Sequence, residues 1–431
     1  MELSRKKNET AIQSSLVYDL IVVFILFHFF GFPGKFTRVF GDKIETLIDF
    51  GCFGLELATM IMSSGDTAMD IKLLDLKAKY RPMYVYVVYI FVTGVMLSTD
   101  RKAEVITCTR LVALLSFSIW AMERYSPQQF LELAYMAQIL IVLANLFMMV
   151  RYSGIAYGYY EGAKAFTGIN GAKNSTASEL AFGVLLQMTL LRIKLNKQEP
   201  VSTFFVGMLG VQLVLLVLTK GTGALLTTCM SVFYVFVMEK RLGESRRIPL
   251  GFLNVLLSIG FLLFALTIIP MFEPILESLG KDATLTGRIP LWERIITITM
   301  ENRPLTGFGY ERLWKETVSV DLIHAGFAST SWFAKMTAGG HSVLVELLGS
   351  TGILGLGLYY LMIILCFRNI PYMTEEQYLY VSAIMLVYTL HGLTERGMSP
   401  TSYYTLFFFT TLSISCSAEK KKPERRRRNL E

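Results

Sequence analysis

The chain has 431 residues and a formal net charge of +7, and 53% of its residues are hydrophobic while only 17% are charged. A soluble domain carries about a quarter charged residues, so this composition, with a mean hydropathy of +0.48, excludes an ordinary soluble protein. The five cysteines form no CxxC pair and no Cys/His metal spacing, so the sequence predicts neither a disulfide framework nor a zinc site.

Apolar runs recur along the whole chain. Runs of about 20 residues mark bilayer crossings, and about twelve are present, which predicts an all-α polytopic membrane protein. The first run is too long for a cleaved signal peptide, so we expect it to be a true anchor. The predicted spans are, in chain order, 15–32, 44–64, 82–98, 104–122, 128–150, 175–192, 203–219, 222–238, 249–270, 342–366, 378–391 and 403–416.

Basic residues between the spans predict the orientation. Lys and Arg accumulate on the cytoplasmic side of bacterial inner-membrane proteins, and twelve spans place every basic cluster on one face, together with both termini. These clusters are Arg5-Lys6-Lys7, 192–197, 240–247 and 420–428. The positive charge therefore indicates orientation. We expect no nucleic-acid partner, because no folded reader of nucleic acid is visible.

The same alternation places four segments outside the cytoplasm: 151–174, 219–223, 271–340 and 391–400. Loops beyond about 15 residues are usually functional or disordered, so the longest segment is the predicted location of the chemistry. The expected organisation has an N-terminal bundle of nine helices, an extracytoplasmic loop between helices 9 and 10, three further helices and a basic cytoplasmic tail. Their bounds are 1–270, 271–340, 341–416 and 417–431.

Within the long loop, residues 289–300 carry apolar side chains at helical spacing, which predicts an amphipathic helix. Arg288 lies at its entrance, and two interpretations of this arginine are open. It could snorkel from a helix in the membrane interface, with Trp292 and Trp314 as anchors. It could instead bind a phosphate, because a planar guanidinium is a well-matched bidentate donor.

His341 follows two glycines and opens the next predicted span. A helix N-terminus disfavours positive charge, so the imidazole should be neutral and able to accept a proton, as a general base requires. The plain alternative is a capping or interface histidine.

Other polar residues sit at the outer ends of spans. Lys173-Asn174 precedes the sixth span and Lys220 ends the seventh, and a lysine in such a place usually snorkels. Glu346 lies about five residues into its span and is expected to face a cavity, since ionisable groups rarely face lipid. Glu395-Arg396 is either a surface ion pair or part of a cavity wall. The nearby glycines, Gly349, Gly352, Gly355 and Gly357, are expected to permit close helix packing.

Taken in order, three motifs resemble the O-antigen ligase and O-antigen polymerase superfamily of multispan GT-C type enzymes. The motifs are Thr286-Gly287-Arg288 with Leu291-Trp292, Pro304…Gly307-Phe308-Gly309-Tyr310, and His341 leading into Leu344, Glu346, Gly349 and Gly352. With Lys173-Asn174, Leu218-Thr219-Lys220 and Thr394-Glu395, the resemblance covers roughly residues 165–400. Two positions depart from it: Ser342 stands where many relatives have Asn, and Lys220-Gly221-Thr222 where they tend to place an arginine.

The resemblance implies a metal-independent glycosyltransferase without a cofactor, working on the outer face of a bacterial plasma membrane. Its donor would be a glycan on a polyprenyl pyrophosphate. By position, Arg288 would bind the donor pyrophosphate and His341 would activate the acceptor hydroxyl. The further residues expected to bind substrate are Lys173, Asn174, Lys220, Thr286, Trp292, Tyr310, Glu346, Glu395 and Arg396.

The motif wording resembles capsule and exopolysaccharide polymerases more closely than lipopolysaccharide ligases, which favours a polymerase whose acceptor is another lipid-linked repeat unit. In a ligase the acceptor would be lipid A–core. A lipid-linked oligosaccharide flippase would share the substrate, but would be expected to carry its charged residues within the spans. Besides donor, acceptor and membrane lipid, a chain-length regulator could be a partner.

Overall fold

The computed structural model describes residues 2–31, 42–63, 78–160, 162–238, 249–272, 287–327, 339–395 and 398–418. Over these residues the chain is helical, with one short two-stranded hairpin added. The predicted all-α class is confirmed.

Each apolar stretch of the sequence forms a helix. Over the described ranges, six helices are long and apolar enough to cross a membrane, as expected of a multi-pass membrane protein, and the assignment of all twelve as spans stays a prediction. The twelve helices are α1 (Glu2–Phe29), α3 (Asp42–Ser63), α4 (Arg81–Leu97), α5 (Arg101–Arg124), α6 (Pro127–Arg151), α8 (Lys173–Asn196), α9 (Thr203–Leu218), α10 (Thr222–Phe233), α12 (Leu250–Thr267), α16 (Val343–Phe367), α17 (Glu375–Thr394) and α18 (Tyr403–Ser417).

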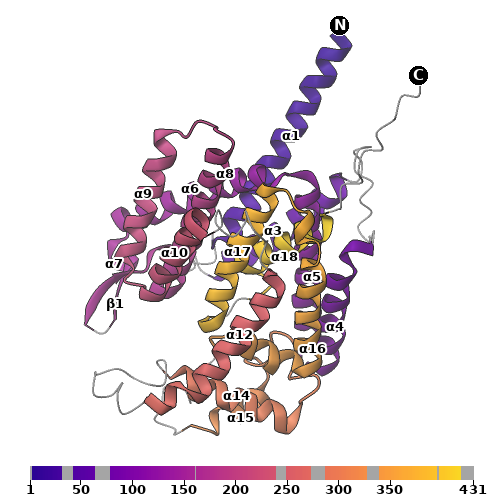
Figure 1. Cartoon of the computed structure of the whole chain (residues 1–431), viewed down its shortest axis with the longest axis vertical. Helices are drawn as coiled ribbons and strands as arrows, with labels where there is room; N and C mark the ends of the chain where they lie inside the picture. Colours follow the sequence, from indigo (N-terminus) through magenta and orange to yellow (C-terminus); the bar gives the residue numbers. More distant parts are fainter. Residues whose placement is uncertain are drawn as a thin grey trace, which may run out of the picture.

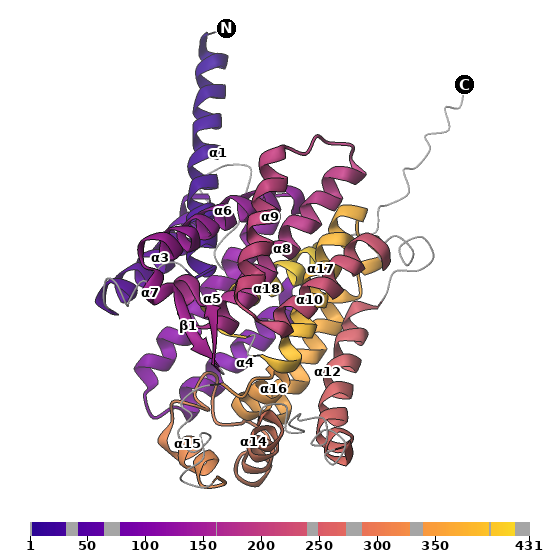
Figure 2. The ribbon, with the colours of Figure 1, turned by 90° about the vertical axis from the view of Figure 1, so that its left-hand side faces the viewer.

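Shorter elements lie between these helices. The N-terminal end of α1 lies at the top of the molecule and the loop helices α14 and α15 lie at the bottom, toward which the hairpin extends (Figures 1 and 2). The shorter elements are α7 (Ser153–Ala156), β1 (Tyr157–Tyr160), β2 (Ala163–Phe166), α14 (Arg288–Asn302), α15 (Thr317–His324), the π-helix η3 (Tyr234–Met238) and the 3₁₀ turns η1 (Ala78–Tyr80), η2 (Gly168–Asn170), η4 (Ile269–Phe272) and η6 (Ile370–Tyr372).

Helix α18 is the centre of the bundle, since every residue from Tyr404 to Cys416 is buried. Its Phe407 ring lies 5.0 Å from the ring of Phe182 on α8 and 5.6 Å from that of Phe130 on α6. Aromatic pairs at such distances add about 0.5–1.5 kcal/mol beyond their buried area. Helices α6 and α8 therefore pack against α18 through closely spaced aromatic rings.

Helix α16 is broken at Gly352, which has φ 66° and ψ −171°. The segment after α14 docks into the break: the amide N of Phe308 donates to the Gly349 carbonyl at 2.9 Å, and the amide N of Ile353 donates to the Pro304 carbonyl at 2.8 Å. Tyr89 donates its hydroxyl to the Thr351 carbonyl at 2.8 Å. Backbone groups freed by a broken helix need such partners in a membrane protein. Gly352 therefore permits the close packing expected of it, but it does so at a break in the helix, against the loop segment that follows α14.

Glycine is required on both sides of this contact. A β-carbon on Gly352 would stand 2.3 Å from the carbonyl carbon of Leu305, and one on Gly307 would stand 2.5 Å from that of Ser350. Both glycines also have positive φ, which costs other residues energy. We call this contact, between residues 304–309 and 349–354, the helix-break clamp.

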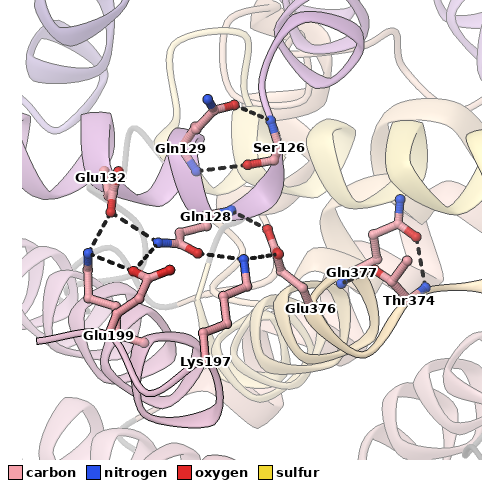
Figure 3. Close-up of polar contacts among 10 residues, drawn as sticks. Ser126, Gln128, Gln129, Glu132, Lys197, Glu199, Thr374, Glu376 and Gln377 are labelled. Carbon is pink, nitrogen blue, oxygen red and sulfur yellow. Dashed lines mark hydrogen bonds and ion pairs between the residues drawn. The ribbon is translucent and has the colours of Figure 1, made fainter.

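The C-terminal end of α8 and the N-terminal end of α17 are held together by a polar network (Figure 3). Lys197 donates to Gln128 at 2.6 Å and to Glu376 at 2.7 Å, and Gln128 donates its side-chain amide to Glu199 at 2.7 Å. One exposed ion pair contributes little, but this network connects the start of α6, the turn after α8 and the start of α17. Both α8 and α17 are thus fixed at the end far from Lys173 and Glu395.

We predict that Gly352→Ala destabilises the protein strongly. The added β-carbon meets backbone atoms that cannot rotate away, and the positive φ alone costs about 1–3 kcal/mol. The measurement is thermal unfolding of the detergent-solubilised protein. Gly357→Ala is the matched control, because it lies in the same helix with nothing within 4 Å of its added β-carbon. Equal unfolding temperatures for the two variants would contradict the clamp.

Candidate active site

A cavity of about 810 Å³ lies where α8, α10 and α17 meet the start of α14. Its wall combines residues that are hundreds of positions apart, and most of its charged groups are basic. Among the residues expected from the sequence, it contains Lys173, Asn174, Lys220, Arg288, His341 and Glu395. Thr286 and Arg396 lie outside the described residues.

Glu395 joins two of these residues by one carboxylate. Its Oε1 accepts a hydrogen bond from Nη2 of Arg288 at 2.8 Å, and its Oε2 lies 3.2 Å from Nδ1 of His341. The three side chains come from the end of α17, the first residue of α14 and the segment before α16. We call them the Arg–Glu–His triad. Their side chains are between 24% and 32% exposed, so a substrate in the cavity can reach them.

Two opposed effects act on the pKa of Glu395. Burial raises it, but the hydrogen bond to His341 and the charge of Arg288, with smaller contributions from His341 and His391, outweigh burial and leave the pKa below its usual range. The carboxylate therefore stays ionised at neutral pH and holds both partners in place.

Glu395 also determines which nitrogen of His341 carries the proton. An ionised carboxylate can only accept, so the contact at 3.2 Å requires a proton on Nδ1. In the neutral ring, the lone pair then lies on Nε2. A base with that lone pair, oriented by a carboxylate on its other nitrogen, has the arrangement of a hydrolase triad histidine.

The backbone corrects the expected position of His341 at the start of a helix. Helix α16 begins at Val343, with Ser342 as its N-cap, so His341 precedes the first turn and does not open the helix. His341 has a φ of 50°, in the left-handed region. The contact that orients the imidazole is the carboxylate of Glu395, and the neutral state expected for the ring stays a prediction.

Arg288 is positioned by the helix that the sequence predicted at 289–300. Helix α14 spans Arg288–Asn302, and its N-cap Gly287 has a φ of 82°, a left-handed conformation that favours glycine. Arg288 uses Nη2 for Glu395, and among the described residues no second acceptor contacts its guanidinium. The remaining N–H groups suit a phosphate.

Two lysines add positive charge to the same wall. Lys173 is the first residue of α8, and its Nζ lies 4.9 Å from the ring centre of Tyr160. Lys220 is exposed between α9 and α10, and no carboxylate of the described residues lies within ion-pair distance of it. Their place in the cavity favours anion binding over snorkelling.

Three residues expected at the substrate lie outside the cavity and support its frame. Trp292 is fully buried and donates Nε1 to the Gly340 carbonyl at 2.6 Å. Glu346 accepts from Nε1 of Trp314 at 2.9 Å and from the amide of Gly340. Tyr310 is 2% exposed and donates to the Met398 carbonyl at 3.5 Å.

The interpretation of Trp292 and Trp314 as interface anchors is also wrong, because both are buried in a small core between α14 and α16. Together with Glu346 they fix the backbone of Gly340, directly before His341. Glu346 lines a separate small cavity of about 70 Å³ and not the main cavity.

The sequence reasoning missed a buried ion pair that attaches the loop to the bundle. Arg312 binds Glu104, a fully buried residue of α5, and also donates to the Asp100 carbonyl at 3.2 Å. Next to it, Glu316 accepts from the hydroxyl of Ser98 at 3.1 Å. A carboxylate inside an apolar helix needs a partner. The place of Glu104 in the apolar run was therefore the sequence feature that could have predicted this ion pair.

Residues 203–360 match the model of the O-antigen ligase family, Wzy_C. This match covers less than half of the chain, so these residues are similar to the O-antigen ligase family. The matched region contains Lys220, Arg288 and His341, and lies inside the 165–400 range of the resemblance noted in the sequence. Members of this family are membrane enzymes that transfer lipid-linked glycans, polymerases as well as ligases. No curated protein matches the chain.

The family match ends before Glu395, yet this residue connects the two central side chains of the domain. We predict that Glu395→Gln lowers glycan transfer about 10²–10⁴-fold. Glutamine offers only one acceptor oxygen in place of two. With that oxygen on Arg288, its N–H₂ would face Nδ1 of His341, so the histidine would take the other tautomer, with its proton on Nε2. The measurement is the transfer rate of purified enzyme, with Glu395→Asp as the charge-preserving comparison. Unchanged transfer by Glu395→Gln would contradict this role.

The same carboxylate predicts a pH dependence of stability. Since the pKa of Glu395 is lower in the folded protein, its stabilisation is complete above the usual carboxyl pKa, about 4.3, and is lost as pH falls through the lowered value. The difference in unfolding temperature between wild type and Glu395→Gln should therefore shrink as the pH falls below about 5. A difference that stays unchanged down to about pH 2 would contradict the ion pairing.

Proposed function

We propose that this protein is a metal-independent glycosyltransferase that polymerises polyprenyl-pyrophosphate-linked oligosaccharide repeat units into a surface polysaccharide. The observation that supports it is the Arg–Glu–His triad, where a phosphate-binding type of side chain and a potential base are held by one carboxylate beside two lysines. The family of the domain supplies the class of substrate, a lipid-linked glycan.

The proposed reaction uses these groups in two ways. His341 Nε2 takes the proton of the acceptor hydroxyl while that oxygen forms a bond to the anomeric carbon of the donor. The bond from this carbon to the pyrophosphate breaks, and the polyprenyl pyrophosphate leaves with the electron pair. Arg288, with Lys173 and Lys220, stabilises the growing negative charge. Glu395 stabilises the imidazolium that forms.

The orientation follows from two helices that join the cavity to the polar network. Helix α8 runs from Lys173 at the cavity to Lys194 at the network, and α17 runs from Glu376 at the network to the triad. With the basic 192–197 loop in the cytoplasm, the cavity faces outward. We therefore propose an extracytoplasmic site in a bacterial plasma membrane, with both termini inside. The basic tail lies outside the described residues, apart from its first two.

The residues of the sequence motifs favour a polymerase over a ligase. Both would use the same triad, and they differ in the acceptor. Purified enzyme given only the lipid-linked repeat unit should produce a ladder of polymer. Transfer only after lipid A–core is added would identify a ligase instead. A flippase would need no base beside its anion site, so the triad favours an enzyme.

We predict that Arg288→Ala abolishes polymer formation and weakens donor binding, at near-normal protein abundance. Arg288→Lys should restore little, because a point charge cannot replace a bidentate fork and cannot hold Glu395 in the same way. Lys173→Ala and Lys220→Ala should reduce activity less, since several cations share the pyrophosphate. Polymer ladders from membranes and binding of radiolabelled donor measure both effects. Full activity of Arg288→Lys would contradict the assignment.

We predict that His341→Ala blocks transfer but preserves donor binding. The histidine acts on the acceptor, and a positioned base contributes about 10²–10⁴-fold to a rate. His341→Gln separates the two roles of the ring, because it keeps a hydrogen bond without taking up a proton. Near-wild-type turnover by His341→Gln would show that orientation suffices. Loss of donor binding in His341→Ala would place the histidine in the pyrophosphate site.

A further inference from the structure

The hairpin before α8 is rich in tyrosine and borders the cavity. Strand β1 is Tyr157-Gly158-Tyr159-Tyr160, and it pairs antiparallel with β2, residues 163–166. The sequence placed this segment outside the cytoplasm but assigned it no role. Of the strand residues, only Tyr160 lines the cavity.

Strand pairing separates the tyrosines onto two faces. Residues opposite each other in a pair share a face, so Tyr159 shares one with Lys164, whose Nζ lies 4.4 Å from the ring centre of Tyr157. On that face Tyr159 is 78% exposed. The opposite face carries Gly158 and Tyr160. One face of the hairpin therefore points to the cavity through Tyr160, and the other presents Tyr159 away from it.

Gly158 makes room for the Tyr160 ring. A β-carbon on Gly158 would stand 2.8 Å from Cε2 of Tyr160 and 3.2 Å from Cγ2 of Thr167. Real β-carbons do not come so close, so any other residue here would move the ring. Position 158 thus leaves space for the Tyr160 ring at the cavity wall.

Lys173 connects this ring to the anion-binding groups. Its Nζ lies 4.9 Å from the Tyr160 ring centre, and Lys173 lines the same cavity as Lys220 and Arg288. A cation over an aromatic face at an exposed site contributes only about 0.5–1 kcal/mol. A pyrophosphate would compete easily for this ammonium, and drawing it off the ring would open the aromatic face.

We propose that Tyr160 is a stacking platform for the donor sugar that is attached directly to the pyrophosphate. This inference rests on the proposed function. The C–H bonds on the flat face of a sugar ring carry partial positive charge, and the aromatic face carries partial negative charge. A pyrophosphate held by Lys173 places the sugar bonded to it next to the Tyr160 ring. Gly158 is a positioning residue for that ring.

The test compares two ligands on the full-length protein in lipid nanodiscs. One is the lipid-linked repeat unit extracted from host cells lacking the enzyme, and the other is bare polyprenyl pyrophosphate. Tyr160→Ala should weaken binding of the sugar-bearing lipid about three- to tenfold, the size expected of one aromatic contact, and leave binding of the bare lipid unchanged. Tyr160→Phe should bind both like wild type, because it keeps the ring.

Two further variants sharpen the result. Gly158→Ala should reproduce part of the Tyr160→Ala loss, since it displaces the ring. Tyr159→Ala is the matched control: the same residue type, one position away and on the other face, should leave binding of both ligands unchanged.

Three outcomes would overturn the proposal. If Tyr160→Ala binds the sugar-bearing lipid like wild type, the ring is no platform. If it loses both ligands equally, Tyr160 merely supports Lys173. If Tyr160→Phe fails like Tyr160→Ala, the hydroxyl and not the ring face makes the contact. Failure of the proposed substrate class is distinct, because wild-type protein would then bind neither ligand, and failure of the polymerase activity is read separately, as the absence of a polymer ladder from the lipid-linked repeat unit alone.

Discussion

The site depends on one partly buried carboxylate that needs two partners. Glu395 is separated from Arg288 by 107 positions and from His341 by 54. A carboxylate taken out of water is costly unless each oxygen is satisfied, and here one oxygen takes the arginine and the other the histidine. The same carboxylate therefore pairs with the charge of Arg288 and aligns Arg288 with His341. If Glu395 moves, Arg288 and His341 both lose the hydrogen bond that positions them.

The surroundings of this contact leave little freedom to move. Gly340 is held by Trp292 and Glu346 directly before His341, and the helix-break clamp holds the segment after α14. The buried pair of Arg312 with Glu104 attaches the same loop to α5. Transition-state stabilisation by fixed charges requires that they need not rearrange during the reaction. The contacts that hold Gly340, Arg312 and residues 304–309 favour such fixed positions for the triad.

Sequence periodicity predicted the helices well, because apolar runs and the spacing of Leu291, Ile295 and Ile298 are local properties. It also named the residues of the triad, but not their contact, since no local pattern joins Glu395 to α14. The sequence could not show that Trp292, Tyr310 and Glu346 lie outside the main cavity, because a motif does not reveal which of its members face the same space. Gly352 was ambiguous for a similar reason: a glycine in an apolar helix suits close packing and a break equally well.

The helix-break clamp has a consequence for how this domain can diverge. Its two sides are joined by backbone hydrogen bonds, which do not depend on side-chain identity, although Gly307 and Gly352 must both stay small. The surface of the loop can then vary freely while its docking geometry is inherited unchanged. Substitutions on the exposed surface of the described loop residues can therefore leave the position of α14 on α16 unchanged.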